Sequence, residues 1–445
     1  MTLNVAIVSL GCSKNLIDSE VMISCISKDS YQITNDASKA EVIIINTCGF
    51  IESAKQESID TILEMAEYKK SGSCKTLIAS GCLAERYKEE LMKELPELDA
   101  VIGTGDYREI TDVIQRTLQG EKVIRYGHQE IVDIDRLPRT ISTFGASAYL
   151  KIAEGCDNRC SFCIIPAIRG RYRSRKMEDI IDEARLLVNS GIREIIVIAQ
   201  DITRYGIDIY GRYRLSELLK ELAAIDGLEW IRLLYSYPDE FSDELINTIA
   251  NEKKICKYLD IPIQHASNRV LKRMARRSSK ESVLHLIKKL RTSMPDIVLR
   301  TSLIVGFPGE TVEDFQELYE FVERVRFNRL GVFIYSREED TGAYNMPDQI
   351  EEAVKAERWD KIMLLQKKIS KENNKKLVGR TLRVLIEGNT EGEYFGRSYM
   401  DAPEIDGKIY FRSKRDLLPG DFANVIIKKV YEYDLVGECA DESGK

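Results

Sequence analysis

The chain has 445 residues, of which 44% are hydrophobic and 31% charged, a composition typical of globular proteins with two or three domains. Its 65 basic and 72 acidic residues give a formal net charge of −7, which excludes a general attraction to nucleic acid or to an anionic membrane. No apolar run approaches the roughly 18 residues that span a bilayer, and the N-terminus lacks a signal-peptide pattern, so we expect a cytoplasmic protein with no membrane partner, whose ten cysteines are reduced.

Residues 1–135 alternate short apolar runs with amphipathic stretches. The runs NVAIVSLG, EVIIINT, KTLIASG and DAVIGTG predict strands, and segments such as SAKQESIDTILEMAEYKK between them predict helices. This alternation predicts an α/β domain with a parallel sheet covered by helices. Residues 136–147 lack such periodicity and are expected to form a linker.

Residues 148–340 restart the alternation with six apolar runs, each followed by a gap long enough for a helix. Six such units in succession predict a partial (β/α)6 barrel, in which functional side chains lie where strands end. Residues 341–377 predict a helical connector with strongly charged faces. Residues 378–441 contain short β-rich runs divided by Gly, Asp and Pro, a pattern typical of a small antiparallel β-barrel.

Three cysteines follow the first predicted barrel strand in a CxxxCxxC spacing: Cys156, Cys160 and Cys163. Polar neighbours argue against core thiols, and the spacing favours a metal site. Both zinc and [4Fe–4S] clusters are held by close thiolates, but structural zinc takes four ligands. Three ligands on a four-iron cluster leave one iron open for a small molecule. A zinc site completed by a distant ligand remains the alternative.

Three further cysteines each follow a predicted strand of the first domain: Cys12, Cys48 and Cys82. The carboxyl ends of neighbouring parallel strands share one edge of the sheet, where open α/β sheets bind ligands. A single cysteine in such a place would be interpreted as a buried core thiol. Three in equivalent positions favour a shared ligand set.

The CxxxCxxC motif with Phe162, on a partial barrel, resembles the radical S-adenosylmethionine superfamily. That resemblance implies that the open iron binds S-adenosylmethionine and that its reductive cleavage yields a hydrogen-abstracting 5′-deoxyadenosyl radical. The complete order of domains resembles the methylthiotransferase family, and Arg169 and Gly170 match its pattern. This implies a second [4Fe–4S] cluster on Cys12, Cys48 and Cys82, which delivers sulfur.

Residues 10–20, 149–175 and 396–407 resemble the branch that modifies an aspartate of the twelfth small-subunit ribosomal protein. Ser13 follows the first ligand cysteine, where the transfer-RNA branch has Gln and the ribosomal branch usually has Pro. The resemblance implies a methylthio group inserted at the aspartate β-carbon, a ribosomal protein as partner and an electron donor of unknown identity. Modification of an adenosine in transfer RNA remains the first alternative. A non-catalytic iron–sulfur or zinc protein with an RNA-binding-type barrel is the second.

The C-terminal barrel resembles the TRAM domain, which binds RNA in relatives. Residues 376–439 carry ten basic and eleven acidic residues, so phosphate binding, and with it RNA binding, is not favoured. An acidic stretch suits a basic ribosomal protein instead. We therefore expect substrate contacts at Asp401, Glu404 and Asp406, the alternative being a solvated turn.

Predicted strand ends of the barrel supply candidate contacts to S-adenosylmethionine. These are Gln200, Gln264 and Gly306, together with Phe162 and with Arg300 on the same strand as Gly306. Glycine at 306 allows close approach of the backbone to an adenine or ribose. Plain packing or loop capping is the alternative for each. No catalytic acid or base is assigned beyond the cysteine ligands.

Overall fold

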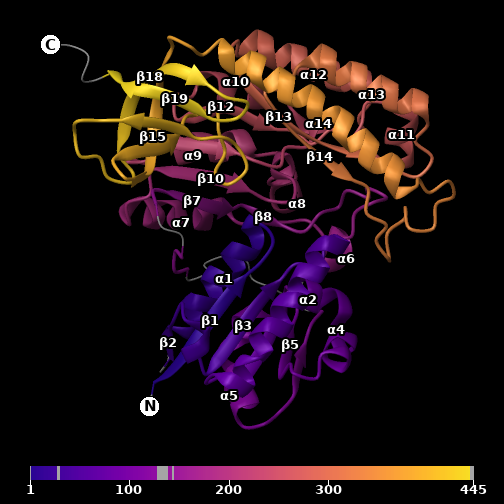
Figure 1. The fold of residues 1–445 in the computed structure, drawn as a ribbon, viewed down its shortest axis with the longest axis vertical. Coiled ribbons are helices and arrows are strands. Elements are labelled where there is room, and N and C mark those ends of the chain that lie inside the picture. Colours follow the sequence, from indigo (N-terminus) through magenta and orange to yellow (C-terminus); the bar gives the residue numbers. More distant parts are fainter. Residues whose placement is uncertain (1, 28–30, 128–138, 143–144, 441–445) are drawn as a thin grey trace. The chain divides into compact units, whose positions relative to one another are not determined.

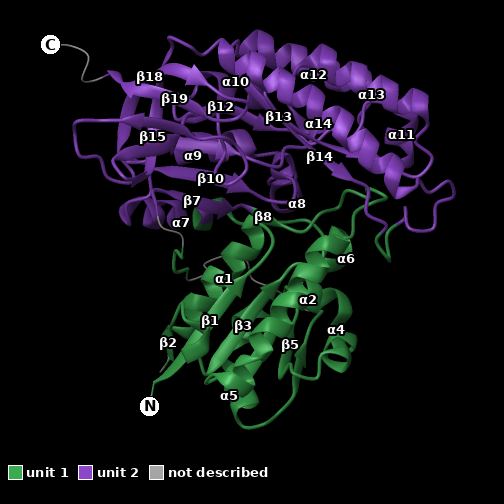
Figure 2. Cartoon of the chain, in the orientation of Figure 1, with its two compact units in different colours: residues 1–142, 153–179, 338–341 green, residues 143–152, 180–337, 342–445 purple. Residues whose placement is uncertain are grey.

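The computed structural model describes residues 2–27, 31–127, 139–142 and 145–440. Figure 2 shows its two compact units. Unit 1 comprises residues 1–142, 153–179 and 338–341, and unit 2 comprises residues 143–152, 180–337 and 342–445. The ranges of these two units do not follow the domain boundaries expected from the sequence, and those boundaries stay predictions. Both three-cysteine sets therefore belong to unit 1.

Unit 1 contains a six-stranded, fully parallel sheet in the order β2-β1-β3-β4-β5-β6 (Figure 1). Its strands are β1 (Leu3–Ser9), β2 (Tyr31–Ile33), β3 (Val42–Thr47), β4 (Thr76–Gly81), β5 (Ala100–Ile102) and β6 (Val123–Arg125). Strands β3 and β4 are buried along their whole length, as expected for a sheet covered on both faces.

Helices cover both faces of this sheet. They are α1 (Ser13–Ile26), α2 (Glu52–Ala66), α3 (Tyr68–Ser71), α4 (Cys82–Glu94, kinked at Lys88) and α5 (Ile110–Leu118). Ile43 and Ile45 of β3 pack with residues of α2 and α4, whereas Ile44 packs with residues of α1 and α5. Successive side chains of a strand point to opposite faces, so one apolar run supplies two cores.

A second segment of unit 1 carries the CxxxCxxC motif. It contains β8 (Ala153–Glu154), which pairs antiparallel with β9 (Arg173–Ser174), and the short helix α6 (Ile165–Arg169) between them. The cysteine loop therefore begins and ends at a two-stranded ribbon.

Unit 2 contains another six-stranded parallel sheet, in the order β14-β13-β12-β11-β10-β7. Its strands are β7 (Ser147–Lys151), β10 (Glu194–Ile198), β11 (Trp230–Leu233), β12 (Ile255–Asp260), β13 (Val298–Val305) and β14 (Arg329–Ile334). The helices of this region are α7 (Met177–Asn189, which begins in unit 1), α8 (Ile207–Tyr210), α9 (Leu215–Ala223), α10 (Asp243–Asn251), α11 (Asn268–Arg273), α12 (Lys280–Ser293), α13 (Val312–Val325) and α14 (Glu352–Lys375).

The C-terminal part of unit 2 is a closed barrel in the order β15-β16-β17-β19-β18. Its strands are β15 (Thr381–Thr390), β16 (Glu393–Arg397), β17 (Ile409–Arg412), β18 (Phe422–Val430) and β19 (Leu435–Cys439). Arg397 fastens this barrel to the parallel sheet, since its Nη2 lies 2.6 Å from Glu194 Oε2. Arg232 Nε lies 2.7 Å from Glu194 Oε1, and its Nη1 donates to the Tyr399 carbonyl.

The predicted fold class is confirmed in all three parts: an N-terminal parallel α/β sheet, a central open parallel sheet and a closed C-terminal β-barrel. The connector predicted at 341–377 contains the single long helix α14. Part of the expected linker at 136–147 lies outside the described residues, as does the end of the first domain expected at 135. Within the described residues, no helix is long and apolar enough to cross a membrane.

Candidate functional site

The structure brings Cys12, Cys48 and Cys82 to one edge of the unit 1 sheet. Cys12 is the N-cap of α1, three residues after β1. Cys48 follows the last residue of β3, and Cys82 follows β4 and begins α4. Because β1, β3 and β4 are adjacent and parallel, all three cysteines stand at the carboxyl ends of neighbouring strands.

The three thiols are close enough to affect one another. A Cβ atom added at Gly11, whose φ is +87°, would lie 3.1 Å from Cys48 Sγ, so glycine lets the Cys12 loop approach Cys48. Burial raises the pKa of Cys82 to about 12, Arg169 opposes this, and Cys12 and Cys48 add to it. Burial likewise raises the pKa of Cys48, and Cys12 adds to that effect. Without a bound metal, burial therefore favours the protonated form of Cys48 and Cys82 at neutral pH.

Buried amides hold the loops of this edge. Asn15 Nδ2 donates to the Leu10 carbonyl at 3.0 Å and to the Thr47 carbonyl at 2.9 Å. Asn46 Nδ2 donates to the Asn15 carbonyl at 2.7 Å. The loops after β1 and β3 are therefore fastened to each other directly before Cys12 and Cys48, which fixes the direction of both thiols.

The CxxxCxxC loop is closed at its base by the backbone. Cys156 N–H donates to the Gly170 carbonyl at 3.1 Å, and Cys163 N–H donates to the Cys160 carbonyl at 3.0 Å. All three cysteines of the loop are half-buried. The loop therefore presents its thiols from a fixed frame without covering them.

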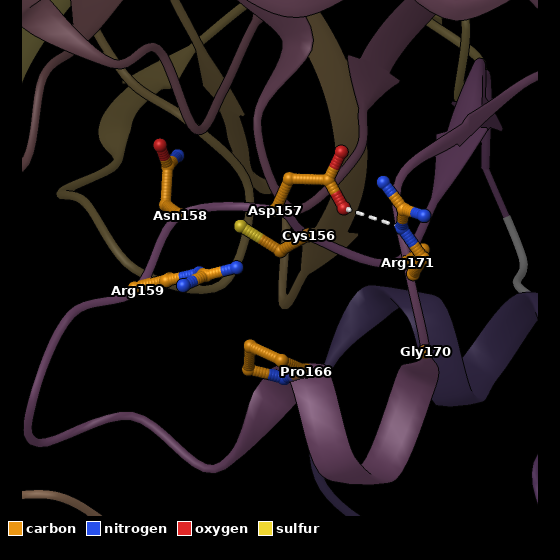
Figure 3. A pocket seen from close by; sticks show the side chains of 7 residues that line it. All are labelled: Cys156, Asp157, Asn158, Arg159, Pro166, Gly170 and Arg171. Carbon is orange, nitrogen blue, oxygen red and sulfur yellow. Dashed lines mark ion pairs between the residues drawn. The ribbon is translucent and has the colours of Figure 1, made fainter.

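A cavity of about 460 Å³ opens beside Cys156 (Figure 3). It is lined by Cys156, Asp157, Asn158, Arg159, Pro166, Gly170 and Arg171. The carboxylate of Asp157 points toward Arg171, with 3.7 Å between Oδ1 and Nε. The cavity thus combines a thiol with charged and amide groups, which suits a small polar ligand beside a metal.

The chemistry of the donors suits iron–sulfur clusters, because each of the two sets consists of three cysteines. Thiolates are the usual ligands of such clusters, and each set gathers three thiols on a rigid frame. In the chain as described, no three potential ligand side chains already stand at metal-binding distance.

Arg169 lies beside the cysteines at a place that the sequence did not explain. Its side chain is 2% exposed, and its Nη2 lies 3.5 Å from Cys82 Sγ. In the sequence, Arg169 and Gly170 only match a family pattern. Its partners on α1 lie within the stretch 10–20 that resembles the family, but nothing in that stretch indicates a contact with Arg169.

Four expected contacts to S-adenosylmethionine lie in unit 2. Gln200 follows β10, and Gln264 follows β12 with a positive φ of 71°, so both occupy the carboxyl edge of the sheet as expected. Phe162, the fifth expected contact, lies in unit 1 on the cysteine loop and is half-buried. Their contact with the cofactor stays a prediction.

The structure gives Arg300 and Gly306 other roles. Arg300 lies near the amino end of β13, and its Nη1 pairs with Asp260 Oδ1 at 2.7 Å, and its contact with the cofactor stays a prediction. Gly306 N–H donates to Glu310 Oε2 at 2.7 Å. A Cβ atom there would lie 2.3 Å from Lys355 Cγ, so glycine is required by the packing of α14.

Of the three acidic residues expected to contact substrate, Asp401 and Asp406 have buried side chains, and the substrate contact stays a prediction. Asp401 is buried, and its Oδ1 lies 2.5 Å from Arg329 Nη2. Asp406 Oδ2 accepts hydrogen bonds from Tyr258 Oη at 2.6 Å and from the Ala402 N–H at 2.8 Å. Both carboxylates fasten the C-terminal barrel to the parallel sheet, because a buried arginine needs anionic partners. Of the three acidic residues, only Glu404 is exposed.

Three family models match the chain. Residues 4–103 match the uncharacterized protein family UPF0004, residues 150–322 match the radical SAM superfamily, and residues 378–440 match the TRAM domain. Together they cover the N-terminal sheet, most of the central sheet with its cysteine loop, and the closed barrel.

Curated relatives match over almost their full length. The ribosomal protein uS12 methylthiotransferase RimO of Thermoanaerobacter sp. (strain X514) is 55% identical over 435 residues, which cover 98% of this chain and 99% of the relative. The protein of the same name from Acetivibrio thermocellus is 52% identical and covers 100% of both chains.

Among solved structures, the radical S-adenosylmethionine methyltransferase TsrM from Kitasatospora setae, with cobalamin and a [4Fe–4S] cluster bound, matches with a TM-score of 0.59. The match covers 77% of each chain at 14% identity, and it supports the fold alone.

Proposed function

This chain belongs to the RimO family of radical-SAM methylthiotransferases, and we propose that it inserts a methylthio group at the β-carbon of an aspartate in ribosomal protein uS12. The observation that carries the proposal is the full-length identity of 52–56% to relatives named for that activity. Because the proposed substrate is a ribosomal protein, the proposal implies the cytoplasmic location expected from the sequence.

We assign two [4Fe–4S] clusters, one to Cys156, Cys160 and Cys163 and one to Cys12, Cys48 and Cys82. When bound, the first with S-adenosylmethionine supplies a hydrogen-abstracting radical, and the second supplies sulfur. The residues of the chain hold and orient these groups. The support is that both three-thiol sets occur in one compact unit, the first beside a polar cavity and the second on one sheet edge.

An anaerobic competition reaction tests the proposal. Reconstituted protein, sulfide, a chemical reductant and S-adenosylmethionine are mixed with uS12 and bulk transfer RNA, and mass spectrometry follows both substrates. We expect a methylthio group on one aspartate of uS12. The same group on an adenosine would overturn the substrate assignment, and absence of both product and 5′-deoxyadenosine would overturn the catalytic one.

Two cysteine variants provide the matched comparison. C160A removes a proposed ligand and should abolish formation of both product and 5′-deoxyadenosine. C256A removes a buried thiol of β12 in unit 2 and should leave both products forming. Equal loss in both variants would point to general instability and contradict the ligand assignment.

A further inference from the structure

Arg169 connects the two cysteine sets of unit 1 through one buried guanidinium. It is the last residue of α6, six residues after Cys163. Its Nη2 donates to Asn15 Oδ1 at 2.5 Å and lies 3.5 Å from Cys82 Sγ. The second distance is within the range of an N–H···S hydrogen bond.

Two carboxylates balance this buried charge. Arg169 Nη1 lies 2.7 Å from Asp18 Oδ2 and 3.3 Å from Glu154 Oε2. Asp18 lies on α1, which begins directly after Cys12, whereas Glu154 lies on β8, two residues before Cys156. One side chain therefore touches an element beside each cysteine set as well as a cysteine sulfur itself.

The backbone around Arg169 is fixed from two sides. Thr104 Oγ1, in the loop after β5, donates to the Ile168 carbonyl at 2.7 Å. The Gly170 carbonyl accepts from the N–H of Cys156 at 3.1 Å. The backbone that carries the guanidinium is thus anchored to the sheet of unit 1 on one side and to the cysteine loop on the other, which limits how far Arg169 can move from Cys82.

The chemistry of this contact is specific to arginine. A guanidinium donates several N–H groups in a fixed plane, so it reaches two carboxylates, an amide and a sulfur at once, and a lysine cannot. Hydrogen bonds to ligand sulfurs and nearby positive charge raise the reduction potential of an iron–sulfur cluster, because the reduced cluster is more negative.

We propose that Arg169 is a positioning residue for the second cluster. Its side chain holds the sulfur of Cys82 at a fixed position relative to the CxxxCxxC loop, and it raises the reduction potential of the cluster bound by Cys12, Cys48 and Cys82. This inference rests on the proposed function, since it requires a cluster on Cys12, Cys48 and Cys82. It goes beyond the proposed function because it assigns an electrostatic and a geometric role to Arg169, which belongs to neither ligand set.

The test isolates the second cluster in the full-length chain. Replacing Cys156, Cys160 and Cys163 with Ala leaves one ligand set, and the cluster reconstituted there is titrated by electron paramagnetic resonance at set potentials. R169K and R169Q are compared in this background. R139K is the matched control, because Arg139 forms a buried ion pair with Glu20 of the same helix α1.

We expect R169K to shift the midpoint potential to more negative values and R169Q to shift it further, with iron content retained and R139K unchanged. In the chain with all six cysteines, R169K should raise the ratio of 5′-deoxyadenosine to methylthiolated uS12. If R169Q does not fold, R169K carries the test, because it keeps a cation beside Asp18 and Glu154.

Two outcomes are distinguishable. Unchanged potential, spectrum and product ratio in R169K, with a working wild-type enzyme, overturn the inference alone. Absence of any cluster in the chain that retains only Cys12, Cys48 and Cys82 overturns the two-cluster assignment of the proposed function, and the inference with it.

Discussion

Glu85 of α4 makes the stability of unit 1 depend on pH near neutrality. Its side chain is 3% exposed, and its Oε2 accepts a hydrogen bond from the Thr104 N–H at 3.0 Å. Burial raises the pKa of this carboxyl from 4.5 to about 7, although the hydrogen bond from Thr104 and the charge of Lys88 oppose the shift. Among the described residues, no lysine, arginine or histidine forms an ion pair with Glu85, so burial prevails.

The sign and size of the effect follow from linkage. Between pH 4.5 and about 7 the folded protein holds a proton that the unfolded chain releases, so the free energy of unfolding falls as pH rises through this range. Each tenfold change in proton affinity corresponds to about 1.4 kcal/mol, so the loss is on the order of 3 kcal/mol by pH 8. Below pH 4.5 both states are protonated, and the effect vanishes.

Urea unfolding of the metal-free, reduced protein at a series of pH values measures this loss. In E85Q the amide oxygen still accepts from Thr104 but does not titrate, so E85Q should become more stable than wild type by about 3 kcal/mol between pH 4.5 and pH 8. E90Q, at an exposed position of the same helix, should follow wild type. Parallel pH profiles of wild type and E85Q would refute the reasoning.

Three other substitutions test iron binding at the cysteine edge of unit 1 and the stability of unit 2 independently. C82A should lower the iron bound after reconstitution by about half, whereas C74A, at the opposite end of β4, should leave it unchanged in an iron assay. R397M should lower the free energy of unfolding by about 3–5 kcal/mol, because it leaves the buried Glu194 without one of its cations, whereas R383A, in an exposed pair, should cost less than about 1 kcal/mol in the same urea titration. D401N should destabilise the protein and leave its fold unchanged by circular dichroism, because it leaves the buried Arg329 without its closest carboxylate.

Hydrophobic periodicity was sufficient to predict most of the fold. All ten apolar runs taken as strands of the two parallel sheets occur as strands, because each is long enough to show a buried run bounded by turn residues. The sequence missed the edge strands β2 and β6. Both are partly exposed and lack a continuous apolar run, whereas β5, which is equally short, is buried along its whole length and was predicted.

The site was predictable where its residues carry a spacing or a repeated position. The six cysteines have one or the other, and the structure puts each set on a common frame. Arg169 and Asp18 have neither, since they are 151 residues apart and meet only through the packing of the cysteine loop in unit 1. That long-range contact also explains why residues 153–179 group with the N-terminal sheet, which no local pattern indicates.

The C-terminal barrel shows why counting charges in a sequence misjudges a surface. Of the ten basic and eleven acidic residues at 376–439, Arg397, Asp401 and Asp406 have side chains no more than 3% exposed and serve to fasten the barrel. Once these are set aside, nine residues of each sign remain. A barrel with balanced charge attracts neither a basic protein nor a polyanion over long range. The assignment of uS12 as substrate therefore depends on family membership, and the competition between uS12 and transfer RNA is the measurement that decides it.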